Sequence, residues 1–285
     1  MSDFLKTIHD LTAQPAPAVT EFDIPGPAGG LAAALYQPHS PGPLPVVLYF
    51  HGGGFVSGSI HDAAVPARYI AQHCPAIVLC VSYSLAPQRP FPAAPEDAYC
   101  ALIWLISNAD RIGADAQRLA IAGDDAGGNL AACLAFIARD RNAGAIAAQV
   151  LIAPMLDPSM TRVDDAVRAG SGRTADACAD CYRQYLPKAV QRMHPYAAPL
   201  ESRRLVGLPA ALLITADCDV LHRETEKYAA ALIDAGVHTQ FTRYAGIEHS
   251  LLRSHPDTLA EIVNFLRQRF AESPFTPIPK HSLKD

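Results

Sequence analysis

The chain has 285 residues, of which 50% are hydrophobic and 18% are charged, and its formal net charge is −5. This balance is that of an ordinary globular protein with one large core. The small negative charge offers no basic surface to nucleic acid or to an acidic membrane. No apolar run approaches the roughly 20 residues of a membrane-spanning helix, and the first ten residues do not read as a signal peptide. We therefore expect a cytoplasmic protein with no nucleic-acid partner and no membrane span.

Short apolar runs alternate with helical patterns along most of the chain. The expected strands, in chain order, cover residues 31–36, 46–50, 76–83, 119–122, 150–153, 211–215 and 239–244. The expected helices cover residues 95–109, 127–139, 224–235 and 258–270. This alternation predicts an α/β fold with a mostly parallel sheet and helices on both faces. Ligands of such sheets bind at the carboxyl ends of the strands, so the residues that follow each strand matter most.

Two glycine-rich motifs follow expected strands. After Phe50 comes H-G-G-G-F (51–55), whose glycines allow backbone N–H groups to turn toward a developing oxyanion. After Ala122 comes G-D-D-A-G-G-N (123–129), which has the glycine–x–nucleophile–x–glycine spacing of a nucleophile elbow between a strand and a helix. The central residue of this elbow is Asp125. Taken alone, the second motif also fits an acidic cap at the start of a helix.

A carboxylate and a histidine follow two later strands. Asp219 lies just past the strand that ends at Thr215, where it can orient an imidazole. His249 lies past the strand that ends at Tyr244, where its imidazole can act as a general base. A lone histidine or aspartate is more often a surface or cap residue. The order of nucleophile position, acid and histidine is nevertheless that of an α/β-hydrolase triad, and the joint pattern predicts one site.

With these motifs in place, the sequence from about 46 to 270 resembles the hormone-sensitive-lipase-like family of esterases, the bacterial family IV. The most specific elements are HGGGF at 51–55, the block from Ser82, GDDAGGNLA at 123–131, ADCDVLHRE around Asp219 and GIEHS around His249. The usual elbow of the family reads G-D-S-A-G-G. The resemblance implies an α/β-hydrolase fold, short- to medium-chain esters as small-molecule substrates, no metal and no cofactor. It also implies that homodimers are common.

Site roles carry over from the family by position. Asp125 stands at the nucleophile position, Asp219 is the triad acid and His249 is the base. The implied oxyanion hole consists of Gly53, Gly54 and Ala126. The predicted substrate-binding residues are Phe55, Asp124, Tyr182 and Tyr185. The resemblance further implies that residues 1–285 form a single domain. Its cap over the acyl pocket would consist of about 1–30 and the polar insertion of about 157–208.

An aspartate in the nucleophile position changes the expected chemistry. A carboxylate attacks an unactivated ester poorly, because the product would be a mixed anhydride. Carboxylates do act as nucleophiles at sp³ carbon, as in displacement on an epoxide or a haloalkane. Opposite charges in contact favour both charged forms, so we expect an ion pair between Asp125 and His249 that holds His249 protonated.

Three hypotheses follow from these considerations. The first is an ester hydrolase scaffold whose activity is impaired by Asp125. The second is a hydrolase that uses Asp125 as nucleophile or base on a non-ester substrate of the epoxide or haloalkane type. The third is a non-catalytic ligand-binding homologue. The H-G-G-G loop favours the first hypothesis, because it suits a carbonyl oxygen better than an epoxide.

Overall fold

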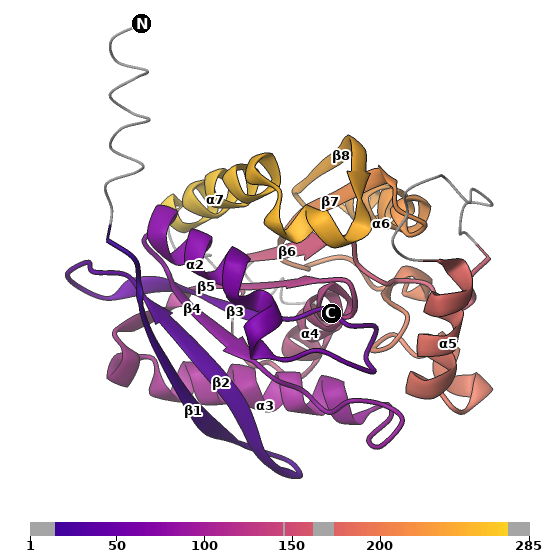
Figure 1. The fold of residues 1–285 in the computed structure, drawn as a ribbon, viewed down its shortest axis with the longest axis horizontal. Coiled ribbons are helices and arrows are strands. Elements are labelled where there is room, and N and C mark those ends of the chain that lie inside the picture. The colour runs from indigo at the N-terminus through magenta and orange to yellow at the C-terminus, as the bar shows by residue number, and fades with distance from the viewer. Residues whose placement is uncertain (1–14, 145, 162–173, 273–285) are drawn as a thin grey trace, which may run out of the picture.

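The computed structural model describes residues 15–144, 146–161 and 174–272, and these form one eight-stranded sheet covered by helices (Figure 1). The strand order is β1-β2-β4-β3-β5-β6-β7-β8. From β3 to β8 all neighbouring strands are parallel, whereas β1 and β2 pair antiparallel with each other and β2 pairs antiparallel with β4. The strands are β1 (Ala18–Gly26), β2 (Gly29–Gln37), β3 (Leu44–Phe50), β4 (Ile77–Val81), β5 (Ala114–Asp124), β6 (Ala148–Ile152), β7 (Ala210–Cys218) and β8 (Thr239–Glu248).

Helices cover both faces of the sheet. The α-helices are α2 (Ala64–His73), α3 (Ala93–Asn108), α4 (Ala126–Asp140), α5 (Ala175–Tyr185), α6 (His222–Asp234) and α7 (Pro256–Ala271). The short 3-10 helices are η1 (Ile60–Ala63), η2 (Asp110–Ile112), η3 (Ala189–Met193), η4 (Pro199–Glu201) and η5 (His249–Ser254). Side chains of α3, α4 and α6 join one buried cluster, and those of α2 and α7 join the other (Figure 1). The predicted α/β architecture with helices on both faces is thus confirmed.

The central strand β3 shows why the sheet needs two covered faces. Val46, Leu48 and Phe50 point into the cluster with α3 and α4, while Val47 and Tyr49 point into the cluster with α2 and α7. All five side chains are fully buried. Successive residues of a strand face opposite sides, so a continuous apolar run belongs to a strand that is buried on both faces.

The N-terminal part of the expected cap lies elsewhere. The resemblance implies that residues up to about 30 belong to the cap, but the structure places 18–26 in β1 and 29–30 at the start of β2, at the outer edge of the sheet. Ile24 is the one fully buried residue of β1, and Pro17 before the strand and Pro25 within it interrupt the pattern by which the sequence could reveal it. Residues 1–14 of this expectation lie outside the described residues.

The insertion of about 157–208 contributes α5, η3 and η4 in its described part. Its backbone carbonyls accept hydrogen bonds from the body of the protein. The Phe91 N–H donates to the Tyr185 carbonyl at 2.9 Å, and the Asn129 side-chain amide donates to the Ala197 carbonyl at 3.0 Å. Residues 162–173 of the insertion lie outside the described residues. That this segment acts as a cap over an acyl pocket stays a prediction.

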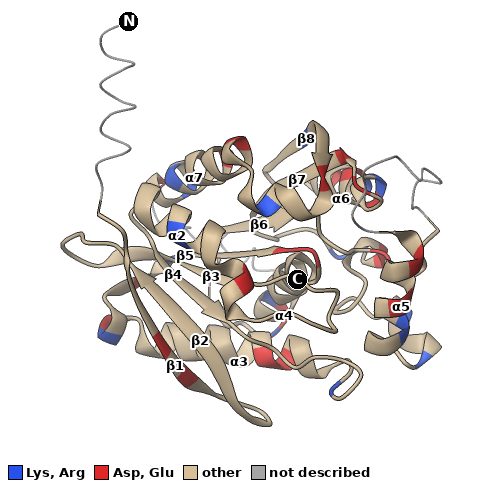
Figure 2. Cartoon of the chain, in the orientation of Figure 1, with Lys and Arg blue, Asp and Glu red and all other residues tan. Residues whose placement is uncertain are grey.

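Charged residues are spread over the elements rather than gathered on one of them (Figure 2), as the small net charge leads one to expect. Within the described ranges, no helix has both the length and the apolar character to span a membrane.

Candidate active site

Four strand ends bring the predicted site residues to one edge of the sheet. The glycine loop follows β3, Asp125 follows β5, Asp219 follows β7 and His249 follows β8. Strands β3 and β5 are parallel neighbours, as are β7 and β8. The carboxyl ends of parallel strands meet at the same edge, which is where α/β sheets bind ligands.

Asp125 forms a sharp turn between β5 and α4. Its backbone has φ 54° and ψ −117°, a left-handed conformation that costs a non-glycine residue about 1–3 kcal/mol. The turn is anchored by its own N–H, which donates to the Ile152 carbonyl at 2.9 Å, and by its carbonyl, which accepts from Met155 N–H at 3.1 Å. A Cβ at Gly127 would lie 2.0 Å from the Phe50 carbonyl oxygen, so a glycine is required there. This is the local structure that the elbow motif predicts.

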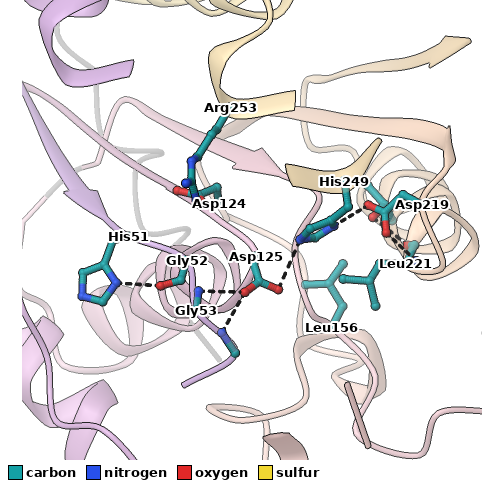
Figure 3. Close-up of polar contacts among 12 residues, drawn as sticks. His51, Gly52, Gly53, Asp124, Asp125, Leu156, Asp219, Leu221, His249 and Arg253 are labelled. Carbon is teal, nitrogen blue, oxygen red and sulfur yellow. Dashed lines mark hydrogen bonds and ion pairs between the residues drawn. The ribbon is translucent and has the colours of Figure 1, made fainter. Parts of the chain in front are cut away.

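The two oxygens of the Asp125 carboxylate have different partners (Figure 3). Oδ2 accepts hydrogen bonds from the N–H groups of Gly53 at 2.9 Å and Gly54 at 2.8 Å. Oδ1 lies 3.6 Å from Nε2 of His249, within ion-pair distance. Both side chains are largely buried, with exposed fractions of 4% for Asp125 and 9% for His249. The sequence predicted the contact with His249, but it did not predict that the carboxylate itself binds the glycine loop.

His249 is oriented from its other side by Asp219. Its Nδ1 lies 2.9 Å from Oδ2 of Asp219, whose side chain is fully buried (Figure 3). Oδ1 of Asp219 accepts a hydrogen bond from the N–H of Leu221 at 2.9 Å, which fixes the carboxylate. A carboxylate bound to Nδ1 sets the position of the imidazole and leaves Nε2 to face Asp125.

Next to Asp125 lies a cavity of about 150 Å³ lined by Gly53, Asp124, Asp125, Ile152, Ala153, His249, Ser250 and Arg253. Asp124 is buried there. It accepts from the Tyr49 hydroxyl at 3.0 Å, and its other oxygen lies 3.4 Å from an Arg253 nitrogen. Burial raises the pKa of Asp124 to about 6, with Arg253 opposing the shift and the charge of Asp125 adding to it.

The predicted substrate-binding residues divide into two groups. Asp124 lines the cavity, whereas Phe55, Tyr182 and Tyr185 do not occur among its described lining residues. The three aromatic side chains are buried together. The rings of Phe55 and Tyr185 stack at 3.8 Å, and those of Phe55 and Tyr182 lie 6.1 Å apart. The structure thus brings Phe55 and the two tyrosines into one aromatic cluster. Ala126 is the first residue of α4, directly after Asp125.

Sequence reasoning missed two residues near this site. Arg253 shares the short helix η5 with His249, and its position four residues after the histidine is the signal that was overlooked. Glu224 is buried and accepts from the N–H of Leu156 at 3.0 Å. Burial and the nearby Asp157 and Asp219 raise its pKa well above the usual range. Its helical position five residues after Asp219 gave no sign of this burial.

Comparison with known proteins agrees with the fold. A family model described as the alpha/beta hydrolase fold matches residues 47–253. The chain is 38% identical over 229 residues to an ethyl acetate hydrolase of Pseudomonas putida, covering 78% of this chain and 72% of that protein. It superposes on an esterase of the hyperthermophilic archaeon Pyrobaculum calidifontis with a TM-score of 0.83 at 36% identity, covering 93% of this chain and 88% of the other. A thermostable carboxylesterase from a metagenomic library gives a TM-score of 0.85 at 32% identity, with 94% of each chain covered.

The chain therefore belongs to the α/β-hydrolase-fold family and, within it, to the hormone-sensitive-lipase-like carboxylesterases. It is a carboxylesterase-type hydrolase.

Proposed function

We propose that the site binds and cleaves small carboxylic esters through a nucleophile–histidine–aspartate arrangement, and that Asp125 makes this cleavage slow. Asp125 occupies the nucleophile position, His249 is the general base and Asp219 orients it. The N–H groups of Gly53 and Gly54, together with that of Ala126, form the oxyanion hole. The distances from Asp125 to the glycine loop and to His249 support these roles.

The scaffold suits ester hydrolysis for reasons that do not depend on the nucleophile. Asp219 holds the imidazole by Nδ1, so that Nε2 can take a proton from a nucleophile and return it to a leaving alcohol. Two fixed N–H donors in a largely buried site stabilise charge that develops on a carbonyl oxygen. Ala126 begins α4, where the helix dipole adds positive potential.

One observation supports impairment most directly. Oδ2 of Asp125 accepts from both glycine N–H groups, and these are the donors that an ester carbonyl would need. An incoming ester must therefore displace a bound carboxylate. The same carboxylate places a negative charge 3.6 Å from His249, which favours an imidazolium that cannot act as a base. The carboxylate is also a weak nucleophile, which further slows ester cleavage.

The test compares Asp125→Ser with Asp125→Ala on p-nitrophenyl esters from acetate to octanoate. Both substitutions remove the carboxylate that accepts from the N–H groups of Gly53 and Gly54. Serine also supplies a nucleophile, whereas alanine does not. We expect kcat/KM of the serine variant to exceed that of the wild-type chain by at least about 100-fold, because covalent catalysis is restored. The alanine variant should stay within about tenfold of wild type, with the oxyanion hole alone contributing.

A serine variant that folds, as judged by an unchanged melting temperature and circular dichroism spectrum, but shows no gain on any ester would contradict the proposal. That outcome would favour a site for binding rather than turnover. The cavity of about 150 Å³ further predicts that activity falls beyond short acyl chains.

A further inference from the structure

We propose that Glu224 is a positioning residue of the site, because its buried carboxyl group fixes the helix that follows Asp219 against the chain segment that holds the elbow of Asp125. The inference rests on the proposed roles of Asp125, Asp219 and His249. The observation behind it is a pair of consecutive backbone N–H groups after β6, one of which reaches the elbow while the other reaches Glu224.

The segment 153–157 leaves β6 and connects the elbow with α6. The N–H of Met155 donates to the Asp125 carbonyl at 3.1 Å, and the side-chain amide of Asn129 donates to the Met155 carbonyl at 2.6 Å. The next N–H, that of Leu156, donates to Oε1 of Glu224 at 3.0 Å. Figure 3 shows Leu156 among the residues of the site. Two neighbouring peptide groups thus bind the elbow on one side and Glu224 on the other.

On the far side of this bridge, Glu224 and Asp219 share the start of α6. The Asp219 carbonyl accepts the N–H of His222 at 3.2 Å, and Oδ1 of Asp219 accepts the N–H of Leu221 at 2.9 Å. Glu224 lies in the first turn of the helix that begins at His222. A shift of this turn relative to the elbow therefore moves Asp219, and with it the imidazole of His249. A displacement of about 1 Å in a catalytic group can cost about 100-fold in rate.

The charge of Glu224 suits a role in positioning. Its side chain is buried, and among the described residues no basic side chain forms an ion pair with it. The titratable groups that face it are Asp157, Asp219 and Tyr182. Burial, together with the charges of Asp157 and Asp219, raises the pKa of Glu224 well above its usual range, although the N–H groups of Leu156 and Asp157 oppose the shift.

Glu224 is therefore a neutral acid at pH 7, whose carbonyl oxygen still accepts a backbone N–H. A second negative charge beside Asp219 would raise the pKa of His249 and weaken the imidazole as a base. A glutamine at position 224 has the same shape, the same acceptor and no charge, so it should replace Glu224 in this role.

The experiment compares Glu224→Leu, which removes the acceptor, with Glu224→Gln, which keeps it. Gln149→Leu is the matched control. Gln149 is fully buried near the start of β6, and its side-chain amide donates to the Pro209 carbonyl at 3.1 Å. This hydrogen bond lies at the amino ends of the strands, away from the site. Gln149→Leu therefore breaks a buried hydrogen bond of similar kind without touching the bridge.

The first measurement is the pKa of His249 by NMR in the otherwise wild-type protein, with His249→Gln used to assign the imidazole signals. The contact of His249 with Asp125 at 3.6 Å favours the imidazolium. Glu224→Leu should loosen this contact, so the pKa should fall by at least about 0.5 unit. In Glu224→Gln and Gln149→Leu it should stay within about 0.2 unit of wild type.

The second measurement repeats the three substitutions in the Asp125→Ser chain with p-nitrophenyl acetate as substrate. Glu224→Leu should lower kcat by at least about 30-fold and change KM by less than about threefold, because the catalytic groups are misaligned while the substrate still binds. Glu224→Gln and Gln149→Leu should each keep kcat within about threefold. The NMR measurement needs no ester cleavage, so failure of the ester proposal and failure of this one are distinguishable.

Three results would overturn the proposal. The first is an unchanged pKa of His249 in Glu224→Leu. The second is an equal change in Gln149→Leu, which would reveal a general effect of lost stability. The third is an equal fall in Glu224→Gln, because Glu224 would then act through a negative charge. A leucine variant that does not fold is replaced by Glu224→Asp, whose carboxyl group is one methylene short of Leu156. Its His249 pKa should fall by at least about 0.3 unit, and an unchanged value would equally overturn the proposal.

Discussion

Asp124 and Asp125 are neighbours in the chain, yet their carboxylates lie in opposite electrostatic settings. Asp125 accepts two backbone N–H groups and lies next to a histidine. Asp124 has the Tyr49 hydroxyl and a more distant Arg253, and burial raises its pKa to about 6. Hydrogen bonds to the charged form stabilise a carboxylate, whereas burial without enough of them favours the protonated acid.

This difference predicts how stability depends on pH. The pKa of Asp124 rises from 3.8 to about 6 on folding, so between these values the folded state holds a proton that the unfolded state has lost. The contribution of Asp124 to the free energy of unfolding is therefore fully present below pH 3.8 and decreases as pH rises to about 6. The total change is about 3 kcal/mol.

Asp124→Asn should remove this contribution while keeping an acceptor for Tyr49. Urea unfolding of both proteins from pH 4 to pH 7 measures the effect. As pH rises from 4 to 7, the free energy of unfolding of the variant should increase by about 2–3 kcal/mol relative to that of wild type. A difference in unfolding free energy that is constant with pH would show that folding leaves the pKa of Asp124 unchanged.

At the scale of elements, the elbow depends on how closely α4 approaches β3. Gly127, in the first turn of α4, lies against the backbone of Phe50 at the end of β3. The glycine loop that follows β3 can then reach Asp125. The hydrogen bonds of the site thus rest on a backbone contact between two elements rather than on side-chain packing.

Gly127→Ala should therefore be severely destabilising. The new Cβ would lie 2.0 Å from the Phe50 carbonyl oxygen, which forces α4 away from β3. We expect a loss of about 3 kcal/mol or more in the free energy of unfolding. The matched control is Gly207→Ala, where φ is +78° and nothing lies within 4 Å of the added Cβ, so the cost should be about 1 kcal/mol. Equal losses in the two variants would contradict the role of the close approach.

The sequence predicted the elements that have strong apolar patterns and are buried on both faces. The run at 46–50 and the motif at 123–129 led directly to β3, to β5 and to the elbow. The edge strand β1 was harder to predict because it fully buries only Ile24 and contains Pro25, a residue that strands tolerate mainly at an edge. Site residues that follow strand ends were located by the same logic, since parallel strands end at one edge.

Other parts of the site depend on side-chain directions that the chain does not reveal. The hydrogen bonds of the Asp125 carboxylate to Gly53 and Gly54 depend on the direction of its side chain, which the motif alone leaves open. Phe55 and the tyrosines of α5 are predicted to contact the substrate, and the structure shows that their rings also pack against one another. Aromatic residues gain most from mutual burial, and a pattern in the sequence does not separate that from ligand contact.

At the scale of the whole molecule, an α/β-hydrolase fold surrounds Asp125, which lies at the proposed nucleophile position. The fold of the chain agrees with that of esterases of known structure. The carboxylate of Asp125 accepts from the N–H groups of Gly53 and Gly54, where we propose that an ester carbonyl binds. Removing the Asp125 carboxylate should therefore allow a carboxylate from solution to bind the N–H groups of Gly53 and Gly54.

Calorimetric titration of butyrate into Asp125→Ala and into the wild-type protein tests this claim most directly. The alanine variant leaves the N–H groups of Gly53 and Gly54 to a carboxylate from solution, and hydrogen bonds to a charged group contribute about 1.5–3 kcal/mol each. We predict saturable binding to the variant that is at least about tenfold tighter than to wild type. Equal affinity of butyrate for the two proteins would contradict the account, because the Asp125 carboxylate would then not compete for these donors.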